Sequence, residues 1–493
     1  MADRAAGRRA WPLPFVQWQD VSLHATEGMY APVGHTATEQ AGSGGLTATE
    51  HRLGNGLRLV LSEDHLNPVV AVCLWYDVGS RYEVQGRTGL AHLFEHLMFQ
   101  GSAQVKGNGH FELVQGAGGS LNGTTSFERT NYFETMPAHQ LELALWLEAD
   151  RMGSLLAALD EESLQNQRDV VKNERRQRYD NVPYGTAFER MAALAYPEGH
   201  PYHHIPIGSM ADLDAVTLDD ARAFFRTYYA PDNAVLAIVG DFDPGQARRW
   251  AEKYFGSIPS RDGKVPPRDS ALPDIIGAEL RAEIREEVPA RALMAAYRMP
   301  RDGTRECDAA ELALTVLGDG MASRLYNRLV RRDRTAVTAG VGLLRLAGAP
   351  SLGWLDVKAS GDAQIPQIEA AVDEELARLR AQAPSAREMK RAQALVEREW
   401  LDRLDTVAGR ADELCRYAVL FGDPQLAFTA VNRILDVTAE EVRAVAAARL
   451  RPDNRAVLAY ELTTSHDPAD PAGPADDQAA PANENDNRDG AGQ

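Results

Sequence analysis

Short apolar stretches separated by polar turns characterise the chain after residue 46. Residues 57–61 alternate apolar and polar positions and residues 69–76 are continuously apolar, so each stretch predicts a strand, the second one buried. The turn-forming sequence Asp-His-Leu-Asn-Pro lies between them, and we expect the two strands to form a hairpin. Apolar residues then recur at helical spacing over residues 89–99, 140–156 and 161–179. This mixture of strands and helices predicts an α+β protein.

The second half of the chain repeats a pattern of the first half. Residues 216–220 (Val-Thr-Leu-Asp-Asp) recur as residues 437–441 (Val-Thr-Ala-Glu-Glu). At the same offset, the Pro-Asp-Asn sequence at 231–233 recurs at 452–454, and a short apolar strand follows each copy. Two matches at one spacing indicate a duplicated α+β unit.

Changes in composition mark the boundaries of this duplicated unit. We expect an N-terminal extension over residues 1–46, a first domain over 47–259 and a second domain over 275–462. Between the domains, residues 260–274 are rich in proline and charged residues and predict a linker. Residues 463–493 are dominated by Asp, Pro, Ala, Asn and Gly and predict a disordered acidic tail.

Charge and composition exclude several classes of protein. The 493 residues carry a net charge of −19, which argues against nucleic acid as a partner, because phosphate binding needs a basic surface. No apolar run is long enough to span a membrane, and three widely separated cysteines form no metal or redox spacing. The basic N-terminal segment is interrupted by prolines and lacks the apolar core of an export signal. The sequence as given therefore predicts a cytoplasmic location, or a periplasmic one if an upstream signal has been removed.

The sequence His92-Leu93-Phe94-Glu95-His96 is the main candidate for chemistry. On a helix, His92 and His96 share a face and can reach one ion, and Glu95 points toward it as well. Two imidazoles and a carboxylate suit a tetrahedral zinc site with one open position, where a bound water of lowered pKa can attack a carbonyl carbon. The carboxylate beside that water can take its proton and deliver it to the leaving amine. The alternative for an isolated match is a structural histidine pair on an amphipathic helix.

The distribution of histidine and acidic residues limits the number and the ligands of such a site. Of the 12 histidines, only His466 lies beyond residue 204, so we expect one metal site, in the first half. A third protein ligand is expected from the helix over residues 161–179, where Gln167, Val171 and Glu174 share one face. Glu174 is the carboxylate on that face. Its alternative is an ordinary solvated helix acid.

His92-Xaa-Xaa-Glu95-His96, followed 78 residues later by Glu174 within Arg-Asp-Val-Val-Lys-Asn-Glu-Arg-Arg, resembles the M16 family of peptidases. This family includes pitrilysin, insulinase and mitochondrial processing peptidase, and its short M16B branch fits the length best. The resemblance covers residues 47–462 and extends to the stretches Gly-Gly-Ser-Leu-Asn-Gly-Thr-Thr, Thr-Asn-Tyr-Phe and Tyr-Tyr-Ala-Pro-Asp-Asn.

The resemblance implies two tandem homologous α/β-sandwich domains, of the LuxS-like metallohydrolase fold, that form half of a clam-shaped chamber. It also implies that His92, His96 and Glu174 bind one Zn²⁺ per chain and that Glu95 is the general base. The stretch Ser120, Leu121, Asn122, Gly123 and Thr124 is similar to the family's edge strand, which binds an extended peptide by strand addition. The resemblance assigns Asn122 the role of orienting the substrate carbonyl, and the alternative is an ordinary turn asparagine.

Two departures from the family pattern bear on the mechanism. Members often carry a second acid seven residues before the distal ligand, and Gln167 stands there, so Glu174 is expected to be supported by an amide hydrogen bond or by another residue. Active members also place an Arg and a Tyr after a Ser-Arg-Leu-aromatic stretch in the second half, to hold the substrate over the zinc. Here these positions are Val330 and Val337, and Arg331 or Arg332 can replace them only with a register shift.

These features together imply a zinc-dependent endopeptidase that cleaves peptides or unfolded segments inside a chamber. We expect it to be the catalytic subunit of a heterodimer whose homologous partner lacks zinc and supplies the Arg/Tyr pair. The first alternative is a non-catalytic M16-like structural or peptide-binding subunit of a larger complex. The second is a different zinc hydrolase that shares only the short motif.

Overall fold

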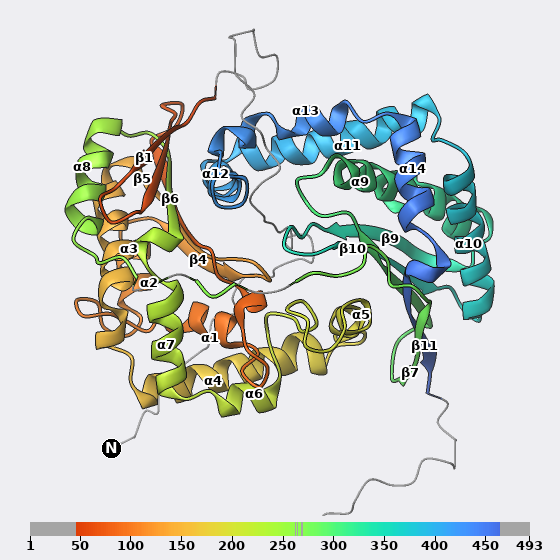
Figure 1. The fold of residues 1–493 in the computed structure, drawn as a ribbon, viewed down its shortest axis with the longest axis horizontal. Coiled ribbons are helices and arrows are strands. Elements are labelled where there is room, and N and C mark those ends of the chain that lie inside the picture. The colour runs from red at the N-terminus through yellow and green to blue at the C-terminus, as the bar shows by residue number, and fades with distance from the viewer. Residues whose placement is uncertain (1–45, 262, 264, 268–269, 464–493) are drawn as a thin grey trace, which may run out of the picture.

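The computed structural model describes residues 46–261, 263, 265–267 and 270–463, so the predicted N-terminal extension and acidic tail lie almost wholly outside the described residues. The chain forms two mixed β-sheets, one in each half, with helices around them (Figure 1). The first sheet has the order β1-β2-β6-β3-β5-β4: Thr49–Arg52, Arg58–Glu63, Ala234–Gly240, Val69–Tyr76, Thr130–Pro137 and Ser120–Thr125. The second has the order β7-β11-β8-β10-β9: Leu280–Glu286, Arg455–Leu462, Ala292–Met299, Ser351–Ala359 and Ala336–Leu344. The described part of the segment 260–274 contains no helix or strand.

The predicted hairpin of the first sheet is wrong. Both strands form, but β6 lies between them, parallel to β2 and antiparallel to β3. All seven residues of β6 are buried. The backbone N–H and C=O groups of a buried strand cannot bond water, so they need a partner strand on each edge, and an interior position in the sheet provides both. Residues 64–68 therefore connect strands that are not neighbours.

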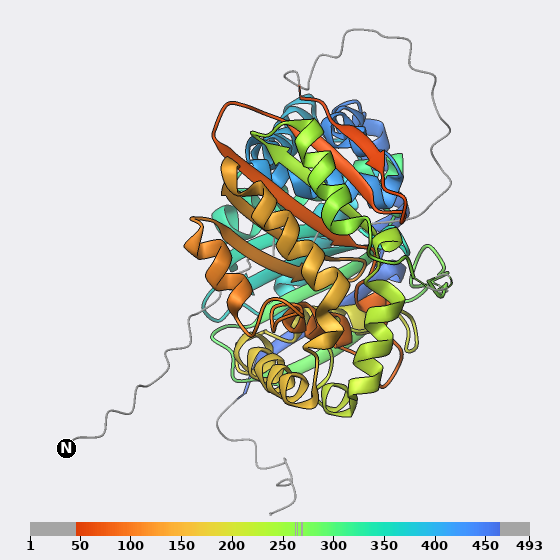
Figure 2. The same ribbon diagram turned by 90° about the vertical axis from the view of Figure 1, so that its left-hand side faces the viewer.

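The helices of the first half lie across its sheet, as Figure 2 shows from the side of that half. Alternate residues of β3 and β6 point into the core that these helices form, because successive side chains of a strand face opposite ways. The predicted helices over residues 89–99, 140–156 and 161–179 are confirmed within a few residues. The helices of the first half are α1 (Leu90–Leu97), α2 (Gly109–Gly116), α3 (Leu141–Ser154), α4 (Glu161–Arg175), α5 (Ala187–Ala195), α6 (Met210–Ala215), α7 (Leu218–Tyr228) and α8 (Pro244–Phe255).

The second half has its own layer of helices, and the predicted duplication is visible in its details. Thr217 and Thr438 form capping boxes at the starts of α7 and α14. After each helix, a Pro-Asp-Asn turn places an asparagine, Asn233 or Asn454, whose side chain donates to two backbone carbonyls. The helices of the second half are α9 (Arg305–Gly318), α10 (Ile365–Ala381), α11 (Ala386–Asp405), α12 (Val407–Phe421), α13 (Ala430–Leu435) and α14 (Ala439–Arg449).

Two helices cross from one half to the other. Helix α12 covers the remaining face of the first sheet, where Cys415 lies against Cys73 and Val235 (Figure 1). Helix α5 covers the corresponding face of the second sheet, and Arg298 donates to the carbonyl of Ala195 at 2.8 Å. Each sheet is therefore sandwiched between helices of its own half and one helix of the other. None of the helices in the described ranges is long and apolar enough to cross a membrane.

Candidate metal centre

Helix α1 places the two motif histidines on the face that is turned away from the core. Its apolar residues are buried beneath the sheet, and Phe94 stacks against Phe225 and Tyr229 with ring centroids 5.9 and 5.0 Å apart. His92 and His96 lie on the other side, with their rings 4.9 Å apart. The apolar stripe thus fixes the rotation of the helix and points both imidazoles toward α4.

Helix α4 supplies Glu174, as predicted. The helix begins with a capping box at Asp160 and buries the face that carries Gln167 and Val171. The Oε2 atom of Glu174 lies 3.2 Å from Nε2 of His96 and 3.8 Å from Nε2 of His92. Each of the three side chains is about 12% exposed, and their ligand atoms all lie within 4.8 Å of one another. The predicted ligands are therefore brought together from two helices into one possible metal site.

The protonation states of His92 and Glu174 suit a metal cation. Burial lowers the pKa of His92, which favours the neutral imidazole that binds metals. Burial opposes ionisation of Glu174, but the neighbouring His92, His96 and Arg178 outweigh it and lower its pKa to about 2. Burial also disfavours charge on His96, but its hydrogen bond to Glu174 and the nearby carboxylates raise its pKa. Two imidazoles and an ionised carboxylate are a zinc donor set.

Glu95 stands beside this site with spare hydrogen-bonding capacity. Its Oε2 atom is buried and has no hydrogen-bond partner among the residues that the structure describes. A buried carboxylate oxygen left without a partner costs free energy, and such orphaned groups are typical of functional sites. The residues present therefore fit a zinc ion with a bound water beside Glu95.

The predicted peptide-binding stretch forms β4, which is the edge strand of the first sheet. Gly123 packs so tightly that a Cβ atom there would lie 3.2 Å from Cγ of Glu95 and 3.1 Å from Cδ1 of Tyr132. A glycine at this position lets the strand approach the helix of the metal motif. The side chain of Asn122 accepts a hydrogen bond from the backbone N–H of Gly123 at 2.9 Å. Its predicted role toward a substrate stays a prediction.

Arg178 is a residue that the sequence patterns did not single out. It donates to Oε1 of Glu174 at 2.6 Å, from a π-helical turn over Arg176–Asp180 that continues α4. The i,i+4 spacing of Glu174 and Arg178 was the signal that could have found it. Gln167 is buried two turns earlier on the same helix, and the structure gives no hydrogen bond between it and Glu174. Support for the ligand by Gln167 stays a prediction.

A second group of potential metal ligands lies wholly buried nearby and consists of His110, Glu134 and Glu148. Burial raises the pKa of each glutamate to about 7 and lowers that of His110 to about 3. Arg151 already supplies a cation here, because its Nε atom donates to Glu148 at 2.9 Å and its guanidinium lies 4.2 Å from the ring centroid of Tyr132. This group is a buried ion network beneath β5, and its cation site is taken by arginine.

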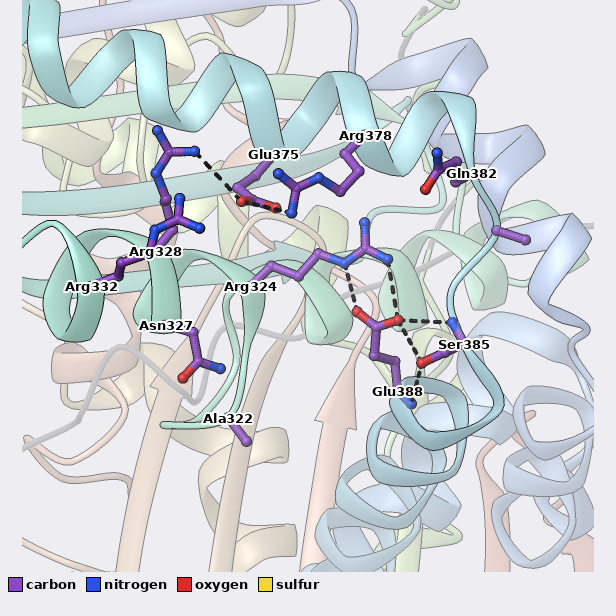
Figure 3. A pocket seen from close by; sticks show the side chains of 11 residues that line it. Ala322, Arg324, Asn327, Arg328, Arg332, Glu375, Arg378, Gln382, Ser385 and Glu388 are labelled. Atoms are coloured by element: carbon purple, nitrogen blue, oxygen red, sulfur yellow. Dashed lines mark hydrogen bonds and ion pairs between the residues drawn. The ribbon is translucent and has the colours of Figure 1, made fainter.

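Valines stand at the two positions of the second half where the resemblance led us to look for an arginine and a tyrosine. Val330 packs against the core of that half, and Val337 is 55% exposed on β9. Arginines close to them line a pocket of about 540 Å³ between the π-helical segment Tyr326–Arg332, α10 and the start of α11 (Figure 3). Figure 3 shows that Arg324 donates two hydrogen bonds to the carboxylate of Glu388.

The neighbouring arginines are engaged within the same half. Arg328 binds Asp333 and Glu374, and Arg332 binds Asp333 at 3.1 Å. Arg331 lies over the ring of Tyr326, 5.5 Å from its centroid. Their charges are thus committed to local partners.

Two family models match successive segments of the chain, and the second begins within the first half. Residues 58–202, which include the metal motif and Glu174, match the model described as Insulinase (Peptidase family M16). Residues 215–396 match the model described as Peptidase M16 inactive domain. The two matches agree with a single candidate metal site in the first half.

Individual peptidases are also similar to this chain in sequence and in structure. Zinc protease PqqE of Helicobacter pylori is 35% identical over 289 residues, which are 58% of this chain and 64% of that protein. Mitochondrial-processing peptidase subunit beta of Blastocladiella emersonii is 26% identical over 244 residues, which are 50% of this chain and 51% of that protein. Both matches span less than two thirds of the relative's length. The crystal structure of a protease from Helicobacter pylori matches with a TM-score of 0.79 at 28% identity and covers 84% of this chain and 99% of that one.

Proposed function

The chain belongs to the M16 peptidase family, and from that membership we propose that it is a zinc-dependent endopeptidase that cleaves peptides or unfolded polypeptide segments. The observation that carries the proposal is the convergence of His92, His96 and Glu174 beside the unpartnered oxygen of Glu95. A structural histidine pair on an amphipathic helix would have no need of a third ligand from another helix or of a free carboxylate.

In the proposed reaction, His92, His96 and Glu174 would hold the zinc ion. Zinc would supply a Lewis acid and would lower the pKa of the attacking water. Glu95 accepts the proton of that water at its free Oε2 atom and delivers it to the amide nitrogen of the leaving group. The free edge of β4 binds the peptide as an added strand. Because Gly123 has no side chain, β4 itself lies close to Glu95.

We further propose that the active form is a heterodimer. Val330 and Val337 leave the second half without groups that stabilise the oxyanion. Of the nearby arginines, Arg328 and Arg332 are held by local ion pairs, and Arg331 lies over the ring of Tyr326. A homologous chain without zinc would close the chamber and contribute an arginine and a tyrosine. The match of residues 215–396 to a domain described as inactive supports a second half that binds no metal.

A non-catalytic M16-like subunit, structural or peptide-binding, is the second candidate function. The favouring observation is the pair of valines, since a chain that never closes an active chamber has no need of the arginine and the tyrosine. Retention of a complete donor set and of Glu95 weighs against this candidate.

The test compares Glu95→Gln with the wild type, each assayed alone and with the homologous chain from the same source. Glu95→Gln is expected to keep one zinc per chain and to lose roughly a thousandfold in kcat/KM on a quenched peptide library. Glu112→Gln, an exposed acid on α2, is the matched control and is expected to keep full activity. Zinc binding without cleavage by any wild-type combination would favour the non-catalytic candidate. Full activity of the isolated wild type would exclude the heterodimer.

A further inference from the structure

The start of helix α1 has no capping side chain of its own. The residue before the helix is Gly89, at φ +90°, where the left-handed backbone favours glycine. The first N–H groups of any helix lack partners within the helix and must find them elsewhere. Because His92 lies in this first turn, whatever binds these N–H groups also places a metal ligand.

Glu83 binds them from outside the helix. Its Oε2 atom accepts the N–H of Gly89 at 2.9 Å, and its Oε1 atom accepts the N–H of Ala91 at 2.7 Å. The Glu83 side chain is fully buried, so these hydrogen bonds are shielded from water. A carboxylate at a helix N-terminus also interacts favourably with the helix dipole.

His204 holds Glu83 in this position. Its Nε2 atom lies 2.8 Å from Oε2 of Glu83, and the ring also hydrogen-bonds the backbone of Ser80. Burial disfavours charge on His204, but Glu83 outweighs this and raises the pKa of the imidazole. The pair is therefore a charge-assisted hydrogen bond in a site where either partner alone would be costly.

The loop that carries His204 also contacts the other metal-binding helix. Gly208 accepts a hydrogen bond from Arg175, the neighbour of Glu174, at 2.5 Å. Gly208 also lies so close to Gly89 that a Cβ atom on it would be 2.3 Å from the Gly89 nitrogen. Residues 204–208, which we name the anchor loop, thus touch the start of α1 and the end of α4.

We propose that Glu83 and His204 are positioning residues for the metal centre, which tie the start of α1 to the anchor loop so that His92 and His96 meet Glu174. They act through the helix backbone and contact neither substrate nor metal. The inference rests on the proposed zinc site. It adds Glu83 and His204, which belong to no motif, to the residues on which zinc affinity depends.

The test measures the zinc dissociation constant of the full chain by competition with a chromophoric chelator. Glu83→Gln and His204→Gln are each expected to weaken zinc binding about tenfold, which is the usual loss when a residue that orients a metal ligand is replaced. Because Glu83 and His204 act through one contact, their effects should not add. The double variant is expected to bind zinc no more than about threefold more weakly than the single variant with the lower zinc affinity.

Glu128→Gln is the matched control. Glu128 is equally buried and also accepts two backbone N–H groups, those of Ala347 and Gly348, but it contacts neither α1 nor the anchor loop. Its variant is expected to lower the melting temperature of the apo chain while leaving the zinc dissociation constant within twofold. Should Glu83→Gln not fold, His204→Gln carries the comparison. A wild type that binds no zinc would refute the proposed function, whereas zinc affinities of Glu83→Gln or His204→Gln within twofold of wild type would refute this inference alone.

Discussion

Arg178 holds one oxygen of Glu174 at 2.6 Å, while the other oxygen of the same carboxylate faces His96 at 3.2 Å. The carboxylate is thus divided between a guanidinium on its own helix and the candidate metal position. The π-helical turn that follows α4 carries Arg178, and such turns are frequent at functional sites. The orientation of Glu174 is therefore fixed by its own helix before any metal binds.

Removal of this guanidinium should loosen the third ligand. Arg178→Gln is expected to weaken zinc binding about tenfold and to lower kcat/KM in proportion, because Glu174 can then rotate away from the histidines. Chelator competition and peptidase kinetics measure the two effects. Arg176→Gln is the control, since Arg176 lies in the same turn but binds Asn173 on the exposed side. Equal losses in both variants would count against a specific role for Arg178.

Gly123→Ala tests the close approach of the edge strand to Glu95, the proposed general base. The added methyl group would press on Glu95, Tyr132 and Phe99 at 3.1 to 3.2 Å, and we expect a loss of about 1 to 2 kcal/mol in stability. Displacement of Glu95 is expected to lower kcat about tenfold. Gly340→Ala, on the edge strand β9 of the second half, meets nothing within 4 Å and should change stability by less than about 0.5 kcal/mol. Denaturant unfolding and steady-state kinetics distinguish the two, and unchanged kcat in Gly123→Ala would contradict the mechanism.

Zinc at the proposed site should stabilise the folded state as well as support activity, because the proposed ligands come from α1 and α4 and are brought together only in the folded state. Chelation is expected to abolish activity, and zinc at about 100 times its dissociation constant to raise the melting temperature by about 5 °C. His96→Ala removes a ligand and should show no zinc-dependent shift. A rise of the same size in that variant would place the zinc elsewhere.

Glu128 should make stability depend on pH. Burial raises its pKa from an ordinary 4.5 to about 7, although Arg81 and Tyr202 act in the opposite direction. The folded state therefore binds a proton that the unfolded state releases. This contribution to stability is fully present below pH 4.5 and is lost as the pH rises through 7.

Glu128→Gln cannot titrate, so the difference in unfolding free energy between wild type and variant is expected to fall between pH 4.5 and 7. The total change should be on the order of 2 to 3 kcal/mol. Urea unfolding of both proteins at several pH values measures this difference, and the contributions of Glu134 and Glu148 cancel in it. A difference that does not vary with pH would show that Glu128 is ionised throughout.

Local patterns predicted the elements that carry the site. The spacing of His92 and His96 on an amphipathic stretch identified α1, because helical periodicity is visible in sequence. The same periodicity made Glu174 on α4 a candidate third ligand, and the resemblance to the family supplied the reason to choose it. The repeat of the threonine cap and the Pro-Asp-Asn turn predicted the two matching halves. The edge-strand position expected for Ser120 to Thr124 from the resemblance is confirmed as well.

Contacts between distant segments were out of reach of such patterns. The insertion of β6 between β2 and β3 depends on which strands pair across more than 150 residues, and turn chemistry at residues 64–68 favoured the wrong neighbour. Glu83 and His204 are 121 residues apart, and neither has a motif around it. Their contact exists only because the anchor loop returns to the start of α1.

The exchange of α5 and α12 has a consequence for the way this chain can be divided. A fragment that ends at residue 259 would leave bare the face of the first sheet that α12 covers, and the complementary fragment would lack α5. Proteolytic nicking in the segment 260–274 should therefore leave the two pieces associated, whereas each piece expressed alone should aggregate. A single unit of this design would need a second copy of itself, whose helix would cover the exposed face of its sheet. The duplication thus joins within one chain what would otherwise be a domain-swapped dimer.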